Sequence, residues 1–321
     1  MPNNNFMFHF KWMPVLRGTR FEQLSYSQKQ IINHFEFHHE ITTKDELFKN
    51  MMAYAELNKI NIFDYVPLTF VVDVDSQTYS PDLEKFVLFY DAIDSIVKSC
   101  DNKTPDYQKQ CLKLINQKIP QIGLSKDRRA VTHCRPKICE THFAGKNIWI
   151  LKPTGFNRGR GVSVFDTMEK LKNLIKFYSE GAPESGNTST VVPKSETLPK
   201  EGEKKEEASQ PDSKAQSLLT SIKSRTFVIQ KYIEKPLLIH ERKFDVRVWV
   251  LVTHEMKVYF FKEGYIRTSC IAYSIDTDSI ENKNVHLTNN AVQKYCQQYG
   301  AFEDGNQLSF QQFQVKMDLM E

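Results

Sequence analysis

Apolar residues recur at helical spacing in three stretches of the chain. The first follows Thr43-Lys44-Asp45-Glu46, which has the spacing of a capping box. The second opens with Ser80-Pro81, where proline suits the first position of a helix. The third follows Asp166. The pattern therefore predicts three amphipathic helices whose apolar faces belong to the core.

Other stretches combine apolar and β-branched residues and predict strands. They cover residues 65–73, 147–152, 225–233, 243–253, 257–262 and 265–273, and residues 6–12 are either an early strand or part of a poorly ordered arm. This order of elements favours an α+β or α/β fold with a mainly antiparallel sheet in the later half, and we expect the α+β class.

A polar, low-complexity stretch interrupts the pattern at about residues 180–224. It consists of Ser, Glu, Lys, Pro and Gly with few large apolar residues, so it cannot offset the entropy of ordering. Because strand-like sequence resumes at Arg225, we expect a disordered insertion inside one domain. Residues 1–30 lack clear periodicity and are expected to form an N-terminal arm before a domain spanning 31–321.

Composition adds limits without deciding the function. The chain has 321 residues, 40% hydrophobic content and a net charge of +4, which requires no nucleic-acid partner. The first residues lack the order of a signal peptide, and no run approaches the ~20 apolar residues that span a bilayer. The six cysteines form no disulfide framework. We expect a cytoplasmic protein without a membrane partner, and a monomer by default.

One strand carries charges on one face. In the predicted strand from residue 243, the side chains of Lys243, Asp245 and Arg247 alternate with apolar residues and so share a face. Buried charges are costly unless they are paired or bind a ligand. The pattern fits a binding site, but it also fits a solvent-exposed polar face.

A glycine-rich loop follows the strand that ends at Lys152. Gly155, Gly159 and Gly161 flank Arg158, a combination that can present amides and positive charge to phosphates. The loop matches neither the P-loop nor the dinucleotide-binding pattern. An ordinary hairpin turn remains the alternative.

Two weaker signals stand elsewhere. The strand end Gln230-Lys231-Tyr232-Ile233 changes from apolar to polar and can offer main-chain groups to a flat base. Two Cys and two His lie close together in the sequence, but their spacing matches no common zinc finger, so zinc is the minor alternative for this group: His133, Cys134, Cys139 and His142.

Taken in order, five blocks of this sequence resemble the tubulin tyrosine ligase-like family. They are WILKPTGFNRGRGV, FVIQKYIEKPLLI, KFDVRVWVLV, YIRTS and HLTNNAVQK. The resemblance covers most of residues 30–321 and implies an ATP-grasp-like ligase fold with the nucleotide between two lobes.

The resemblance also implies roles for individual residues. Lys152 would contact the nucleotide phosphates, and Arg158 and Gly159 would belong to a mobile loop closing over them. Residues 230–233 would line the adenine pocket. Further contacts to the nucleotide would come from Lys243, Asp245, Thr288 and Asn289.

Two arginines would serve the reaction itself. Arg247 would face the reacting phosphate, and Arg267 would hold the carboxylate of the incoming free amino acid through its planar fork. The family forms an acyl phosphate with ATP and Mg²⁺. Its metal ligands come from later acidic strands that end in a block like I-E-V-N-T-N-P, which is absent up to Glu321. We therefore expect the C-terminal part of the fold to be incomplete and the metal ligands to lie beyond Glu321.

The resemblance implies an ATP-dependent ligase that adds an amino acid to tubulin tail carboxylates. Glycine or glutamate is favoured over tyrosine. Two alternatives remain: a catalytically inactive tubulin- or microtubule-binding relative, and an ATP-grasp ligase for another carboxylate. A cytoskeletal location would follow, with the cilium or axoneme left open.

Overall fold

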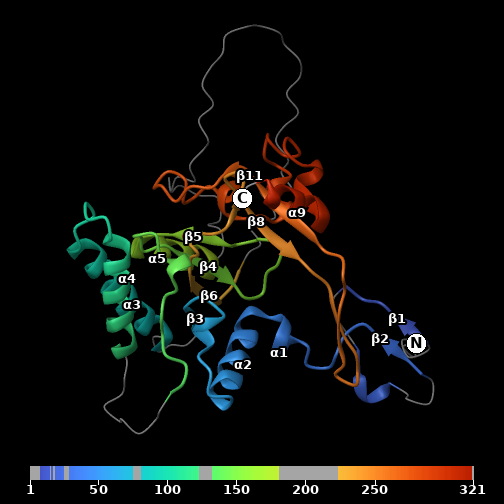
Figure 1. Ribbon diagram of the computed structural model, residues 1–321. Coiled ribbons are helices and arrows are strands. Elements are labelled where there is room, and N and C mark those ends of the chain that lie inside the picture. The colour runs from blue at the N-terminus through green and yellow to red at the C-terminus, as the bar shows by residue number, and fades with distance from the viewer. Residues whose placement is uncertain are drawn as a thin grey trace, which may run out of the picture.

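The computed structural model describes residues 8–14, 16, 19–24, 29–74, 81–122, 132–180 and 223–319. The insertion expected at about 180–224 lies almost wholly outside these ranges, as does part of the expected N-terminal arm. Within the described ranges, the chain mixes helices and strands, as the sequence predicts (Figure 1).

The helices are of ordinary and of very short length. The α-helices are α1 (His39–Thr42), α2 (Lys44–Leu57), α3 (Pro81–Ser99), α4 (Tyr107–Lys118), α5 (Met168–Glu180), α7 (Lys283–His286), α8 (Asn290–Gln293) and α9 (Phe310–Asp318). Single turns of 3-10 helix are η1 (Phe21–Gln23), η2 (Ile62–Asp64), η3 (Ile119–Gln121), η4 (Glu140–His142) and η5 (Asp304–Asn306).

The strands form two larger sheets and two small ones. Their bounds are β1 (Phe10–Lys11), β2 (Ile31–Ile32), β3 (Thr69–Asp73), β4 (Trp149–Pro153), β5 (Ser163–Phe165), β6 (Thr226–Lys231), β7 (Leu238–Ile239), β8 (Arg242–Arg247), β9 (Val250–Val252), β10 (Val258–Phe260), β11 (Tyr265–Ala272) and β12 (Gln307–Ser309).

Each larger sheet has four antiparallel strands. We call the sheet with the order β3-β6-β4-β5 the first sheet and the sheet with the order β12-β11-β8-β7 the second sheet. Strands β9 and β10 form a separate hairpin, and β1 and β2 pair in parallel. The predicted antiparallel character of the later half is therefore confirmed.

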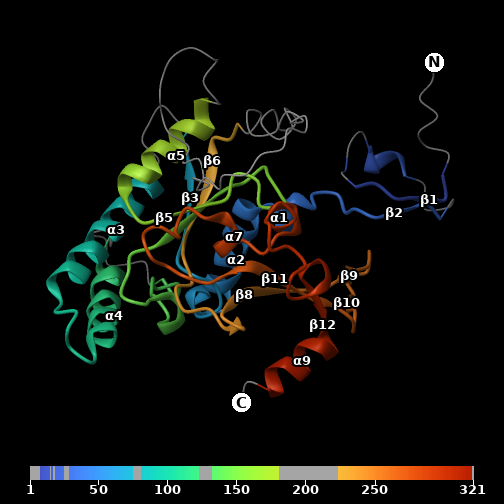
Figure 2. The same ribbon diagram turned by 90° about the horizontal axis from the view of Figure 1, so that it is seen from above.

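The main core lies between the first sheet and the helices that cover it. Figures 1 and 2 both show α3 and α4 side by side on one flank of this sheet. Aromatic rings from α3 and β4 interlock here, with the centroids of Phe86 and Trp149 4.9 Å apart in an edge-on contact. This core fixes β4 and β6, the two neighbouring strands that carry the first part of the site.

A smaller core supports the second sheet. Ile239, Ile266 and Leu308 are buried together, with Phe244 and Phe313 packed against them. Figure 2 shows α9 beyond β12 at the outer edge of this sheet. The packing holds β8 and β11 in register, so that Arg267 lies opposite Asp245.

Two local predictions are wrong. Thr43 makes no capping bond to α2, because α1 ends directly before it and the Thr43 hydroxyl donates backwards to the His39 carbonyl at 3.0 Å. The single strand predicted at 243–253 is two strands in different sheets, because the chain leaves the ladder with β11 after Arg247. The helices predicted after Thr43, Ser80 and Asp166 are confirmed as α2, α3 and α5.

Candidate nucleotide site

Lys152 lies on β4 of the first sheet, beside the glutamine of the neighbouring strand. Its Nζ donates to Oε1 of Gln230 at 2.7 Å, and Gln230 in turn donates from Nε2 to the hydroxyl of Thr69 at 2.8 Å. Burial, together with the charge of Lys44, lowers the pKa of Lys152 to about 8. One hydrogen bond to Gln230, which Thr69 orients in turn, therefore fixes an ammonium group whose charged form burial disfavours.

Lys243 approaches the same region from β8 of the second sheet. Its Nζ donates to the Tyr232 hydroxyl at 3.0 Å and to the His286 carbonyl at 3.2 Å. Burial lowers its pKa to about 8; the charge of Lys152 lowers it further and that of Asp245 opposes the change. Among the described residues, neither lysine donates a hydrogen bond to a carboxylate. An anion beside these two ammonium groups would stabilise their charged forms.

The Lys243 ammonium is held by a short chain of hydrogen bonds. Burial lowers the pKa of His286 to about 4, so its ring is neutral near pH 7. His286 Nε2 lies 2.9 Å from the Ser279 carbonyl, which can only accept, so Nε2 carries the proton. Nδ1 then accepts from the Tyr232 hydroxyl at 2.8 Å. This order leaves the Tyr232 oxygen as an acceptor for Lys243.

Asp245 and Arg267 form the second charged group of the site. Arg267 donates from Nε and from one terminal nitrogen to the two carboxylate oxygens of Asp245, both at 2.8 Å. The hydroxyl of Thr288 donates to the same carboxylate at 2.5 Å. The ion pair raises the pKa of Arg267. The other terminal nitrogen of Arg267 has no acceptor among the described residues, so this edge of its guanidinium is open to a ligand.

The glycine-rich loop reaches the segment that carries Thr288. Arg158 and Gly159 have left-handed backbone angles, with φ of 58° and 79°. A Cβ at Gly159 would lie 2.9 Å from Oδ1 of Asn289. Glycine is therefore favoured by its conformation, and a Cβ at this position would force the Asn289 side chain to shift.

Residues 230–233, the predicted base-binding segment, differ in whether they can reach a ligand. Lys231 is fully buried and paired with Glu234, and its Nζ also donates to the Ile148 carbonyl at 2.9 Å. Its side chain therefore points into the core and away from any ligand. The backbone N–H groups of Lys231 and Tyr232 donate to the carbonyls of Leu68 and Ile148, directly before β3 and β4, whereas that of Ile233 has no acceptor among the described residues.

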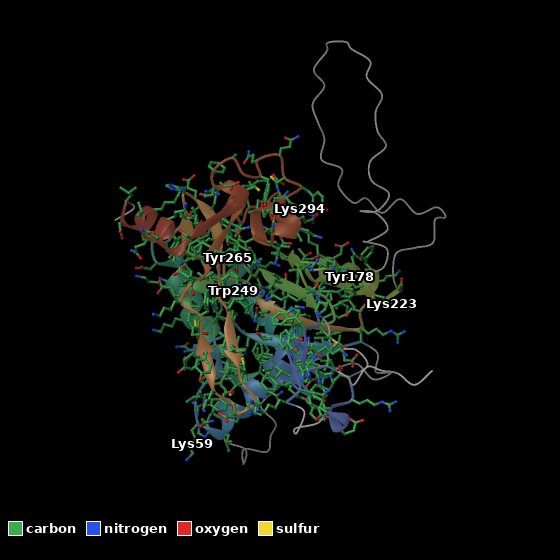
Figure 3. The ribbon with its side chains drawn as sticks, turned by 90° about the vertical axis from the view of Figure 1, so that its right-hand side faces the viewer. Lys59, Tyr178, Lys223, Trp249, Tyr265 and Lys294 are labelled. Carbon is green, nitrogen blue, oxygen red and sulfur yellow. The ribbon has the colours of Figure 1, made fainter. Side chains whose placement is uncertain are left out.

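Arg247 lies at the end of β8, opposite Tyr265 of β11. It is exposed and forms no ion pair with a described residue. Next to it, the ring centroids of Trp249 and Tyr265 lie 5.6 Å apart. Figure 3 labels both residues near the middle of the view. The side chain of Arg247 is therefore exposed at the end of β8, the strand that also carries Lys243.

No group of three or more His, Cys, Asp and Glu side chains in the described part of the chain is arranged to hold a metal ion. The thiol groups of Cys134 and Cys139 instead point at the carbonyls of Ile60 and Phe63, at 3.7 and 3.6 Å. Likewise, none of the helices in the described ranges is long and apolar enough to cross a membrane.

Sequence reasoning missed three residues of the site. Thr69 and His286 act through the hydrogen bonds of Gln230 and Tyr232. Lys44 donates to three carbonyls at the start of the glycine-rich loop. The position of His286 at the head of the HLTNN block was an available signal. Nothing in the local sequence of Lys44 or Thr69 indicates a partner that is about a hundred residues or more away.

The chain is a mixed α+β protein in which the candidate site brings together cationic side chains from two antiparallel sheets. The family model described as "Tubulin-tyrosine ligase family" matches residues 90–320. The chain belongs to the tubulin-tyrosine ligase family.

Several curated relatives are tubulin glycylases by name. The chain is 32% identical to Tubulin glycylase 3B of Tetrahymena thermophila over 175 residues, which are 54% of this chain and 11% of that protein. It is 34% identical to Tubulin glycylase 3D of the same organism over 170 residues, or 51% of this chain and 12% of that protein. With Tubulin monoglycylase TTLL3 of Homo sapiens the identity is 29% over 234 residues, or 71% and 21%. The match thus spans 11–21% of the length of these relatives.

Proposed function

We propose that this protein is an ATP-dependent ligase that joins an amino acid to carboxylates of tubulin tails. The observation that carries the proposal is the pair of ammonium groups of Lys152 and Lys243, which come from two sheets, lie near enough for their charges to interact, and have no bonded carboxylate among the described residues. A nucleoside triphosphate is an anion whose phosphate groups such a pair of ammonium groups can bind. Glycine is the favoured amino acid, because the relatives named above are glycylases; glutamate comes second, and tyrosine is less favoured.

The residues present fit ATP on two further grounds. Gly159 lets the loop backbone approach Asn289 more closely than a residue with a Cβ would allow. The exposed Ile233, with its unbonded N–H group, suits the edge of an adenine ring at the end of β6. We therefore propose an ATP-grasp-like arrangement in which the first and second sheets are the two lobes and the nucleotide lies between them.

The chain's own residues would perform three tasks in this reaction. Lys152 and Lys243 would neutralise the negative charge of the ATP phosphates. Bound ATP would supply the phosphoryl group that activates a carboxylate. Arg247 would face the transferred group from the open end of β8. The open edge of Arg267, held in place by Asp245, would orient the carboxylate of the incoming amino acid. Groups that are already oriented towards developing charge stabilise a transition state strongly.

Mg²⁺ accompanies ATP in our proposal, but the donor set in the described residues does not identify its ligands. The carboxylate of Asp245 is close enough to Lys243 for its charge to act on that lysine, and both of its oxygens are engaged by Arg267. We therefore assign no step to the metal ion. Residues 31–321 would form one domain interrupted by the insertion, and the protein would work as a monomer in the cytoplasm on the cytoskeleton, with the cilium or axoneme as one place of action.

The experiment is incorporation of radiolabelled glycine, glutamate or tyrosine into purified tubulin, with and without ATP. We expect ATP-dependent incorporation of glycine, and its loss in Lys243→Met. Lys98→Met is the matched control, because Lys98 lies on the surface of α3 and pairs with Asp94 at 2.6 Å. ATP binding and microtubule cosedimentation without transfer would instead favour the inactive binding relative. Transfer to a carboxylate other than that of tubulin would favour the third alternative.

A further inference from the structure

Lys44, the first residue of α2, reaches the start of the glycine-rich loop. Its Nζ donates to the carbonyls of Pro153 and Thr154, at 3.0 and 3.5 Å, and to that of Phe156. These carbonyls lie at the end of β4 and in the first turn of the loop. One side chain thus fixes three closely spaced points of the backbone that leads from Lys152 towards Gly159.

Three bonds use every proton that a lysine ammonium group can donate. Lys44 therefore cannot donate to a bound phosphate while it holds the loop, and its role differs from that of Lys152. The position of Lys44 at the start of α2 is also unfavourable for a positive charge. A positive charge in the first turn of a helix meets the positive end of the helix dipole. Burial adds a second penalty and lowers the pKa of Lys44. The three carbonyls offset both.

Lys44 stands outside the part of the chain that identifies the family. The family model begins at residue 90, whereas α2 spans Lys44–Leu57. The bonds of Lys44 therefore connect an upstream helix to the loop of the candidate site. The charge of Lys44 also lowers the pKa of Lys152, after burial, which places the two ammonium groups close enough to interact.

We propose that Lys44 is a positioning residue that clamps the first turn of the glycine-rich loop through the carbonyls of Pro153, Thr154 and Phe156. Through Lys44, helix α2 thereby supports the loop of the proposed nucleotide site. This inference rests on the proposed function for its ligand, but the clamp itself is a property of the protein without nucleotide.

The test compares Lys44→Met with Lys49→Met in the full 321-residue chain. Lys49 lies on the same helix, but its Nζ pairs with Glu46 at 2.7 Å at the surface. Hydrogen–deuterium exchange of residues 154–162 in the nucleotide-free protein measures the clamp, and calorimetric titration with ATP measures its consequence. We expect faster exchange in this loop and about tenfold weaker ATP binding in Lys44→Met alone.

The pH dependence of ATP binding separates positioning from loss of structure. Removing the charge of Lys44 raises the pKa of Lys152, so the decline of affinity at alkaline pH should begin at higher pH in Lys44→Met. Lys44→Arg keeps the charge and several donors, and should restore part of the affinity and the position of this decline. A protein that had only lost packing would show neither effect.

Each outcome decides a different question. Unchanged exchange at 154–162 in Lys44→Met would overturn the clamp, whatever the ATP titration gives. If the unaltered protein binds no ATP, the proposed function fails, while the exchange experiment still decides the clamp. If Lys44→Met does not fold by circular dichroism, Lys44→Gln, which keeps one amide donor, takes its place; equal exchange in Lys44→Gln and the unaltered protein would also refute the proposal.

Discussion

The two partly buried lysines predict a specific loss of ATP affinity at alkaline pH. Lys152 and Lys243 both have a pKa lowered to about 8 by burial, against 10.5 in the unfolded chain. Only the protonated forms attract phosphate. The lysines are therefore almost fully protonated at pH 7, and ATP binding weakens as the pH rises through about 8. Phosphate groups are already ionised throughout this range, since their second pKa is about 6.

The magnitude follows from the proton balance. A group of pKa 8 that must be protonated reduces the affinity by a factor of about 1.1 at pH 7 and about 11 at pH 9, so each lysine contributes roughly tenfold over this interval. Two independent lysines would give about a hundredfold loss. The charge of Lys152 lowers the pKa of Lys243, however, so loss of one proton raises the other pKa, and a hundredfold is an upper bound.

Calorimetric titration with ATP between pH 7 and pH 9.5, at constant ionic strength, tests this reasoning. The logarithm of Kd should rise with pH more steeply than one lysine alone permits. In Lys243→Met the slope should fall to that of a single group, while Lys98→Met should follow the unaltered protein. A Kd that stays constant up to pH 9.5, or a slope that is the same in Lys243→Met, would refute the assignment of these two lysines to the phosphates.

Three further predictions concern the surroundings of these lysines. Gly159→Ala should weaken ATP binding more than tenfold, whereas Gly300→Ala, with a similar φ of 78° but open space around it, should leave the affinity unchanged. Lys231→Met should lower the free energy of unfolding by about 3–5 kcal/mol, since it leaves the carboxylate of Glu234 buried without its partner; urea unfolding measures this, and adding Glu234→Gln should recover part of the loss. Tyr232→Phe removes one hydrogen bond from the Lys243 ammonium and should weaken ATP binding by roughly threefold to tenfold in the same titration.

The sequence predicted most of the local structure, because the periodic signals were strong. The apolar stripe after Pro81 and the alternation from residue 243 each follow from how helices and strands expose their side chains. The interaction predicted at Thr43 and the single strand predicted at 243–253 were wrong, and helices α4 and α9 were not predicted. A capping box assumes that the threonine hydroxyl is available to the helix that follows, and α1 ends directly before it and takes the hydroxyl instead. Local spacing cannot reveal a preceding turn of helix that competes for the same group.

The sequence motifs that make up the candidate site could be recognised. The hydrogen bonds and ion pairs between their side chains could not be predicted. Successive residues on a strand point to opposite faces. Gln230 and Lys231 therefore cannot both present side chains to one ligand, and the structure places Gln230 against Lys152 and Lys231 against Glu234. The contacts of Lys44 depend on the folding of α2 against the first sheet. No pattern within the chain specifies that approach.

The arrangement of positive charge explains why binding and structure should be coupled in this site. Lys44 comes from a helix, Lys152 from the first sheet and Lys243 from the second, and the first and last each lie near enough to Lys152 for the charges to shift a pKa. Like charges in a buried region repel one another, so the nucleotide-free protein holds these three elements together against their own electrostatics. A polyphosphate between the lysines reverses the sign of that interaction. A bound polyphosphate would then attract helix α2 and both larger sheets at once. The nucleotide would thereby connect the two halves of the fold.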